Sequence, residues 1–308
     1  MPQKKISPSS RTATLIGIDF GTNSVRCVLA DTAGRILSES VCDYPRWNKG
    51  MYSSAAENRF RQHPLDYLEC LELAVKNLLK DQNTAAVAGI ALDTTGSTPC
   101  AVDEQGTPLA LLPEFSENPN AMFILWKDHT AIHEAEQINH CAENWQHVQY
   151  RQYIGGSYSC EWFWSKILHI LKTDEQVRKA AFSWVEHCDW MIGELTGKTD
   201  PLTMYRSRCA AGHKAMWHAS WNGLPPEEFL TAVDPLLSGL RSRLFTDTQT
   251  VDHAVGKLSA KWAEKWGLSQ NVTVAGCALD CHMGAIGAGI APGTLLKVFG
   301  TSTCDIAV

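Results

Sequence analysis

Short apolar runs alternate with turn-forming residues over the first third of the chain. Residues 15–18 and 25–30 are apolar runs, and residues 36–41 form a third segment after them. Gly, Thr, Asn and Asp gather in the turns between these segments. Runs of this length between such turns are typical of buried strands. The pattern predicts a three-stranded meander. It is followed by an amphipathic helix over 62–80 and a further buried strand over 86–92.

The rest of the chain favours a mixed α/β sheet flanked by helices. A second hairpin is expected, in which residues 99–102 and 109–112 flank a turn at 103–106. Residues 150–159, rich in Gly and Tyr, are expected to be a loop. Residues 206–218, rich in Arg, His and Lys, are expected to be a solvated charged loop or to supply a cation to a phosphate or hydroxyl group. The apolar spacing predicts helices and a short strand over the following ranges: 130–141, 162–171, 176–195, 225–233 and 260–266 for the helices, and 272–275 for the strand.

One tripeptide occurs twice, as Phe20-Gly21-Thr22 and as Phe299-Gly300-Thr301, each time between two apolar strands. Such turns can expose backbone N–H groups that form a concavity for phosphate oxygens. Asp19 stands directly before the first turn, where a carboxylate could hold Mg²⁺ through water. A plain hairpin with a polar turn explains either segment alone, but the pair suggests a duplicated fold that holds a nucleotide between its halves.

The composition narrows the class of protein. The chain has 308 residues, 44% apolar and 19% charged, which fits a soluble globular protein of one large domain or two ordinary ones. The net charge is -6 and there is no basic stripe, which argues against nucleic acid as a partner. No apolar stretch has the length of a membrane span, and residues 1–13 form a polar tail without a signal peptide.

The cysteines indicate the cellular compartment. There are 11, an odd number without a C-x-x-C pair, which is typical of reduced thiols in the cytoplasm. Cys277, Cys281 and His282 come nearest to a metal cluster, but no second ligand pair completes a four-ligand site. Core thiols beside a functional loop are the preferred interpretation, and a thiol or metal hydrolase is the weaker one.

The apolar run at 121–128 ends in Trp126, Lys127 and Asp128. An aromatic wall beside hydrogen-bonding groups suits a polar ligand. A buried Trp next to a surface ion pair explains the same residues equally well.

Six segments resemble the FGGY carbohydrate kinases, in the order and spacing of that family. They are IDFGTNSVR (18–26), DTTGSTP (93–99), ENPNAMFILWKDHT (117–130), AGHKAMWH (211–218), ALDCHMGAIGAG (278–289) and GTSTCD (300–305). The third and fourth are specific to the ribulokinase branch of the family. The resemblance implies a ribonuclease H-like fold of the actin and sugar kinase superfamily. It also implies ATP-dependent transfer of a phosphoryl group to the terminal 5-hydroxyl of a ketopentose, with L-ribulose first, in arabinose catabolism.

The resemblance also implies roles for individual residues. It makes Asp280 the general base, and it makes Asp19 the carboxylate associated with Mg²⁺. Residues that fall on sugar-contacting segments, or next to them, are Gly96, Ser97, Trp126, Lys127, Asp128, Lys214 and Asp280. The two phosphate turns that would hold ATP are Gly21, Thr22 and Asn23, and Gly300, Thr301, Ser302 and Thr303.

Members of the family are longer than this chain and carry a second ribonuclease H-like domain. We therefore expect a flexible tail at 1–13, an N-terminal sugar-binding domain at 14–291, and the first hairpin of a truncated ATP-binding domain at 292–308. The strand at 295–299 would lack most of its partners, which favours aggregation or a homodimer. The alternatives are an actin-like non-catalytic nucleotide-binding protein and an FGGY kinase for another pentulose or pentitol. Asp280 distinguishes a kinase from the actin-like alternative, because a non-catalytic scaffold does not need a carboxylate base at this position.

The domain assignment predicts that this chain alone has little kinase activity, because the adenosine site and part of the sugar site would be missing. Turnover measured with L-ribulose and MgATP checks this. A rate close to that of ordinary sugar kinases would contradict the assignment.

Overall fold

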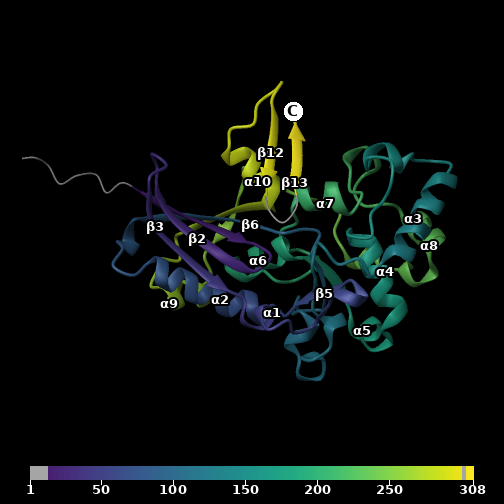
Figure 1. Ribbon diagram of the computed structural model, residues 1–308, viewed down its shortest axis with the longest axis horizontal. Helices are drawn as coiled ribbons and strands as arrows, with labels where there is room; N and C mark the ends of the chain where they lie inside the picture. Colours follow the sequence, from purple (N-terminus) through teal and green to yellow (C-terminus); the bar gives the residue numbers. More distant parts are fainter. Residues whose placement is uncertain (1–12, 300–302) are drawn as a thin grey trace, which may run out of the picture.

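The computed structural model describes residues 13–299 and 303–308 and is built on a six-stranded mixed sheet (Figure 1). The strands lie in the order β10-β11-β6-β1-β2-β3. In chain order their bounds are Thr14–Phe20 (β1), Ser24–Asp31 (β2), Ile36–Asp43 (β3), Val87–Thr94 (β6), Ala254–Lys257 (β10) and Thr273–Leu279 (β11). β6 runs parallel to both β1 and β11, whereas the outer pairs are antiparallel.

The predicted N-terminal meander is confirmed, since β1, β2 and β3 pair consecutively and antiparallel. The run at 15–18 is not buried throughout, however. Ile16 and Ile18 are buried and Leu15 is 45% exposed, because successive side chains of a strand point to opposite faces.

Helices cover the face of the sheet on which Phe20 is buried. The predicted helix over 62–80 is α2 (Pro64–Leu78), which begins with proline and is capped by His63. The Phe20 ring contacts Tyr67 of α2 and His187 of α6 (His187–Thr196), with ring centroids 6.1 and 5.1 Å apart. The predicted helix over 260–266 is α9 (Ala260–Trp266), which packs beside α2 on the same side (Figure 1).

A second apolar core lies among helices gathered away from the main sheet (Figure 1). These helices are α3 (Ile132–Asn144), α4 (Phe163–Thr173), α5 (Glu175–Ala180) and α8 (Glu227–Val233). The remaining short elements are α1 (Pro45–Asn48), β4 (Ser53–Ser54), β5 (Arg59–Gln62), β8 (Phe123–Ile124) and α7 (Arg208–Lys214), with 3-10 turns at Ala55–Glu57, Thr84–Ala86, Leu109–Leu111, Pro113–Phe115, Pro119–Ala121, Tyr150–Tyr153, Ala219–Trp221, Pro235–Leu237 and Arg241–Arg243.

Three predictions in this region are wrong. The hairpin of 99–102 with 109–112 does not form, because β7 (Pro99–Val102) pairs with β9 (Ser183–Glu186) and residues 109–111 form a 3-10 turn. The predicted helix over 176–195 is interrupted by β9, whose four residues are all buried. Pairing with a strand more than eighty residues away overrides the local helical pattern. The loop expected at 206–218 contains α7, which Ser207 caps.

The last described elements follow β11, and the first of them, α10 (Asp280–Gly287), contacts β11 and β6 of the main sheet. α10 is followed by β12 (Leu295–Phe299) and β13 (Thr303–Ala307), which pair only with each other (Figure 1). Leu295 and Phe299 of this hairpin are 64% and 76% exposed. Among the described residues, no helix combines the length and the apolar character needed to cross a bilayer.

Gly106 offers a test of how tightly the turn after β7 packs. Its φ is +78°, and a Cβ there would lie 1.8 Å from the carbonyl oxygen of Thr199. Gly34 has a similar φ of +81° with open space around it. Gly34→Ala should lower the free energy of unfolding by about 1–2 kcal/mol through its backbone conformation alone. Gly106→Ala should cost about 1–3 kcal/mol more through overpacking.

Urea unfolding of the two variants measures this difference. Equal losses for Gly34→Ala and Gly106→Ala would show that the turn can move away from Thr199.

Candidate functional site

Three aspartates lie at one edge of the sheet, at the ends of neighbouring parallel strands. Asp19 in β1 is in register with Asp93 in β6, which is in register with Ala278 in β11. Asp280 follows two residues later as the first residue of α10. The edge beyond the carboxyl ends of parallel strands is where open α/β sheets bind ligands. Sequence reasoning missed Asp93 as a site residue, although it follows the predicted strand over 86–92 just as Asp19 follows the first strand.

The closeness of these carboxylates changes their protonation. Burial raises the pKa of Asp93 from 3.8 to about 9, with further contributions from the charges of Asp19 and Asp280. Burial also raises the pKa of Asp280, against the effect of a 2.6 Å hydrogen bond from the backbone N–H of Cys281. Arg26 forms an ion pair with Asp19 at 2.6 Å. At neutral pH, Asp93 therefore carries a proton.

Two oxygens of this cluster have no partner. Asp19 Oδ1 and Asp93 Oδ1 are buried and form no hydrogen bond with the described residues. Buried polar atoms are almost always paired, so these two oxygens indicate a place for a cation or a proton.

The first predicted phosphate turn lies directly beyond β1. The N–H of Gly21 donates to the carbonyl of Ser24 at 3.0 Å and closes the turn. The N–H groups of Thr22 and Asn23 have no backbone acceptor among the described residues, so they are available to an anion. The indole N–H of Trp126 donates to Thr22 Oγ1 at 3.0 Å, and that of Trp47 donates to Asn23 Oδ1 at 2.8 Å. Two tryptophans therefore hold this turn in place.

Lys214, at the end of α7, brings a positive charge to the same region. Its ammonium group lies 5.3 Å from the ring centroid of Trp162, and its charge lowers the pKa of Asp280. Its side chain is half-buried and has no ion-pair partner within 4.0 Å among the described residues. Asp280, Lys214 and the turn after Asp19 are thus brought together from segments up to two hundred and sixty residues apart.

Residues 14–287 match the N-terminal domain of the FGGY family of carbohydrate kinases. The chain belongs to this family. The resemblance drawn from the sequence motifs is thereby confirmed, and an actin-like scaffold outside the family is not supported.

Curated relatives of this FGGY chain carry the name ribulokinase. The protein from Vibrio parahaemolyticus is 51% identical over 296 residues, which cover 95% of this chain and 52% of the relative. The protein from Shouchella clausii is 36% identical over 306 residues, which cover 95% of this chain and 53% of the relative. The chain spans about half the length of the curated relatives it matches.

Solved structures confirm the predicted fold class. The xylulose kinase from Rhodospirillum rubrum superposes with a TM-score of 0.76 at 16% identity, over 96% of this chain and 55% of that one. The glycerol kinase from Plasmodium falciparum, solved with ADP, gives a TM-score of 0.73 at 14% identity, over 95% of this chain and 53% of that one. At these identities, the likeness concerns the fold alone.

The FGGY segment at 93–99 is held by two buried charges that sequence reasoning missed. The hydroxyl of Ser97 and the N–H of Thr98 both donate to the carboxylate of Glu186, the latter at 2.7 Å. The ammonium group of Lys166 donates to the carbonyls of Ser97 and Leu125 at 2.7 and 2.8 Å. Burial lowers the pKa of Lys166 and raises that of Glu186. Lys166 thereby joins the 93–99 segment to the segment that carries Trp126, and Glu186 holds Ser97 and Thr98 within the first of them.

The residues predicted to contact the sugar have different surroundings in the structure. Ser97 is 1% exposed and its hydroxyl is taken by Glu186. Next to it, a Cβ on Gly96 would lie 2.2 Å from a methyl carbon of Leu279, so a larger residue here would require the Leu279 side chain to move. Lys127 extends over the rings of Phe60 and Trp47, 4.5 and 5.3 Å from their centroids.

Asp128 is buried, and the idea that it takes part in a surface ion pair is wrong. Its carboxylate pairs with the buried guanidinium of Arg61 and accepts from the N–H of Phe60 at 2.7 Å and the hydroxyl of Thr130 at 2.6 Å. A buried carboxylate needs such partners, because removing it from water without them is costly. We therefore assign Asp128 a structural role.

The second predicted phosphate turn cannot be compared with the first. Gly300, Thr301 and Ser302 lie outside the described residues, and Thr303 is the first residue of β13.

The sequence groups Cys277 with His282 as candidate metal ligands, but the structure places them in different clusters. Cys277 is buried in the main core, where its Sγ donates to the carbonyl of Cys188 at 3.3 Å. It is not grouped with His282, which instead lies with Cys209 and His213. Burial lowers the pKa of His282 to about 4, with further effects of His213 and Lys214. His282 is therefore neutral at pH 7.

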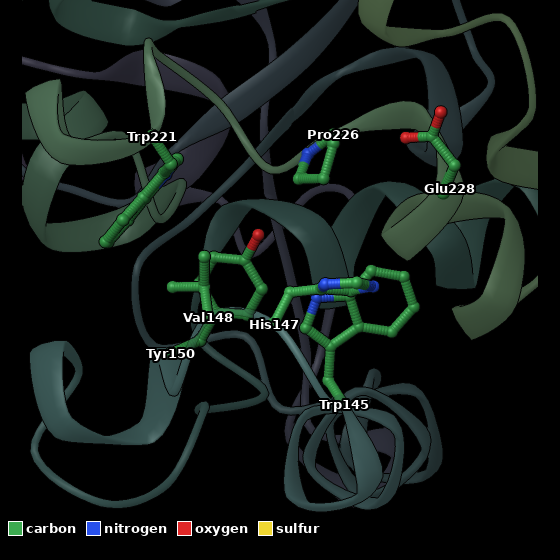
Figure 2. Close-up of a pocket in the computed structure, with 7 residues that line it drawn as sticks. All are labelled: Trp145, His147, Val148, Tyr150, Trp221, Pro226 and Glu228. Atoms are coloured by element: carbon green, nitrogen blue, oxygen red, sulfur yellow. The ribbon is translucent and has the colours of Figure 1, made fainter.

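A hollow of roughly 280 Å³ lies between the end of α3 and the start of α8, and its lining contains none of the three aspartates (Figure 2). Its lining is mainly aromatic and apolar: Trp145, His147, Val148, Tyr150, Trp221, Pro226 and Glu228. The only carboxylate in this lining is that of Glu228, so the hollow lacks the paired acidic groups of the sheet edge. We place the candidate site at the aspartates.

The raised pKa of Asp93 predicts a pH dependence of stability. Between pH of about 4 and about 9 the folded state keeps a proton that the unfolded state releases. The free energy of unfolding should therefore fall as the pH rises through this range. Asp93→Asn should reduce that fall, since asparagine does not titrate.

The midpoints of urea unfolding at pH 5 and pH 8.5 measure the effect. Asp247→Asn, at an exposed position, is the matched control and should leave the fall unchanged. An identical pH dependence in the two variants would argue against a shared proton at Asp93.

Proposed function

We propose that this chain supplies the main part of the sugar site and the first phosphate turn of an ATP-dependent ketopentose kinase, with L-ribulose as the first substrate. The observation that carries the proposal is the position of Asp280 beside Asp19 and Asp93, at the edge where the free N–H groups of Thr22 and Asn23 lie. The 51% identity to a protein named ribulokinase supports the choice of sugar.

In this proposal, Asp280 is the general base. One of its oxygens accepts from the N–H of Cys281, which orients the carboxylate. Burial raises its pKa, so it takes a proton from a primary hydroxyl more readily than an exposed carboxylate does. Lys214 would hold the substrate by its hydroxyl groups and limit the build-up of negative charge near Asp280. Phosphoryl transfer needs mainly such alignment and charge neutralisation.

The residues present fit Mg²⁺ and the phosphates of ATP. The unpartnered oxygens of Asp19 and Asp93 are hard carboxylate ligands of the kind that Mg²⁺ prefers. When bound, Mg²⁺ neutralises charge on the phosphates. Asp93 would lose its proton on binding the ion, and the N–H groups of Thr22 and Asn23 would face phosphate oxygens.

We also propose a division of labour between the parts of the chain. Residues 14–291 would form the sugar-binding domain, and the hairpin at 292–308 would belong to the ATP-binding part. The separate pairing of β12 with β13 supports this division. The 11 cysteines of the chain are free thiols, which supports a reducing compartment such as the cytoplasm.

Sugar binding can be tested on this chain directly. L-ribulose should raise the melting temperature, since a ligand that binds only the folded state stabilises it, and AMP should not. Lys214→Met should abolish the shift, whereas Lys80→Met, at an exposed site after α2, should keep it. No shift with L-ribulose, or an equal shift in Lys214→Met, would contradict the proposed sugar site.

The role of Asp280 is tested by Asp280→Asn in a full-length version of the proposed kinase that carries both domains. We expect turnover to fall by at least about a hundredfold, since the base is lost while L-ribulose still binds. Steady-state kinetics and equilibrium sugar binding together give the answer. If sugar binding were lost while bound sugar turned over normally, Asp280 would be a binding residue and not the base.

A further inference from the structure

Two helices beside the candidate site bring three metal-ligating side chains together. Cys209 and His213 are four residues apart on α7, so they lie on one face of it, and His282 is the third residue of α10. One potential ligand atom from each lies within 4.8 Å of the other two. The proposed kinase mechanism uses none of the three.

The distances suit a tetrahedral metal ion. Cys209 Sγ lies 3.3 Å from His282 Nδ1. Bonds of about 2.3 Å to sulfur and about 2.1 Å to nitrogen at a tetrahedral angle would place these two atoms about 3.6 Å apart. A small movement of either side chain brings both to bonding distance from one ion.

A hydrogen bond engages one ring nitrogen of the third ligand. His213 Nδ1 lies 2.8 Å from the carbonyl oxygen of Cys209. A carbonyl only accepts, so in the neutral ring Nδ1 carries the proton and Nε2 keeps its lone pair. A hydrogen bond from one ring nitrogen to a backbone carbonyl is the usual support for a histidine that binds metal through the other. The rings of His213 and His282 are 4.4 Å apart between centroids.

We propose that Cys209, His213 and His282 bind a thiophilic divalent cation of the Zn²⁺ class, with water in the fourth position. One thiolate and two imidazoles form a donor set that such ions prefer over Mg²⁺. On binding, the S–H bond of Cys209 breaks, a sulfur–metal bond forms, and the proton passes to solvent. The ion would tie the first turn of α10, which begins with Asp280, to α7, which ends with Lys214. In the kinase proposed above, occupancy would inhibit turnover by fixing the base and the lysine relative to each other.

Co²⁺ is a suitable probe, because it has optical bands that Zn²⁺ lacks. Titration of the untagged, reduced chain should show one equivalent of tetrahedral Co²⁺ with a thiolate-to-metal charge-transfer band, and Zn²⁺ should displace it. Cys209→Ser should remove that band, and His213→Gln should weaken binding by at least about tenfold. His213 is exposed, so this variant keeps the test valid even if Cys209→Ser fails to fold.

Matched controls are Cys141→Ser and His140→Gln, a half-buried thiol and an exposed imidazole on α3. Both should bind Co²⁺ like the unchanged chain. Octahedral Co²⁺ without a charge-transfer band, or an unchanged titration in Cys209→Ser and His213→Gln, would overturn the proposal. The measurement needs neither sugar nor ATP, so its failure would leave the proposed kinase function untouched.

Discussion

The parallel register of β1, β6 and β11 is the constraint on which the rest of the structure depends. It brings Asp19, Asp93 and Asp280 to one edge of the sheet. Burial, and then the repulsion between the neighbouring carboxylates, raises the pKa of Asp93 and keeps it protonated, while Asp19 pairs with Arg26. A cluster of buried carboxylates lowers stability and adds no apolar packing, and such clusters with shifted pKa values are typical of functional sites. The same edge carries the turn whose N–H groups remain available.

Buried ion pairs and hydrogen bonds keep this edge in shape. Lys166 and Glu186 come from α4 and β9 and hold the 93–99 segment from two sides. The ion pair of Asp128 with Arg61 holds the segment that follows Trp126. Such charges are expensive to bury and stable only when every partner is in place, so they favour one arrangement of the loops over others.

Local patterns predicted the elements whose partners are near in sequence. The meander of β1 to β3 and the helices α2 and α9 follow from periodicity and short turns, and the structure contains them. The pattern failed where distant pairing decides the outcome. Residues 183–186 are apolar enough to continue a helix, yet they form β9 because β7 offers an unpaired edge. Nothing within either segment indicates the other, because strand pairing depends on how the intervening helices fold back.

The sequence by itself determined the family, the fold class and the two aspartates at its motifs, because these depend on residue types in a fixed order. Only the tertiary structure decided which side chains meet. It added Asp93 to the site, buried Asp128 against Arg61, and separated Cys277 from His282. The reason is physical. A side chain's protonation and available hydrogen bonds depend on neighbours within a few ångströms, and in this fold those neighbours come from segments far apart in the chain.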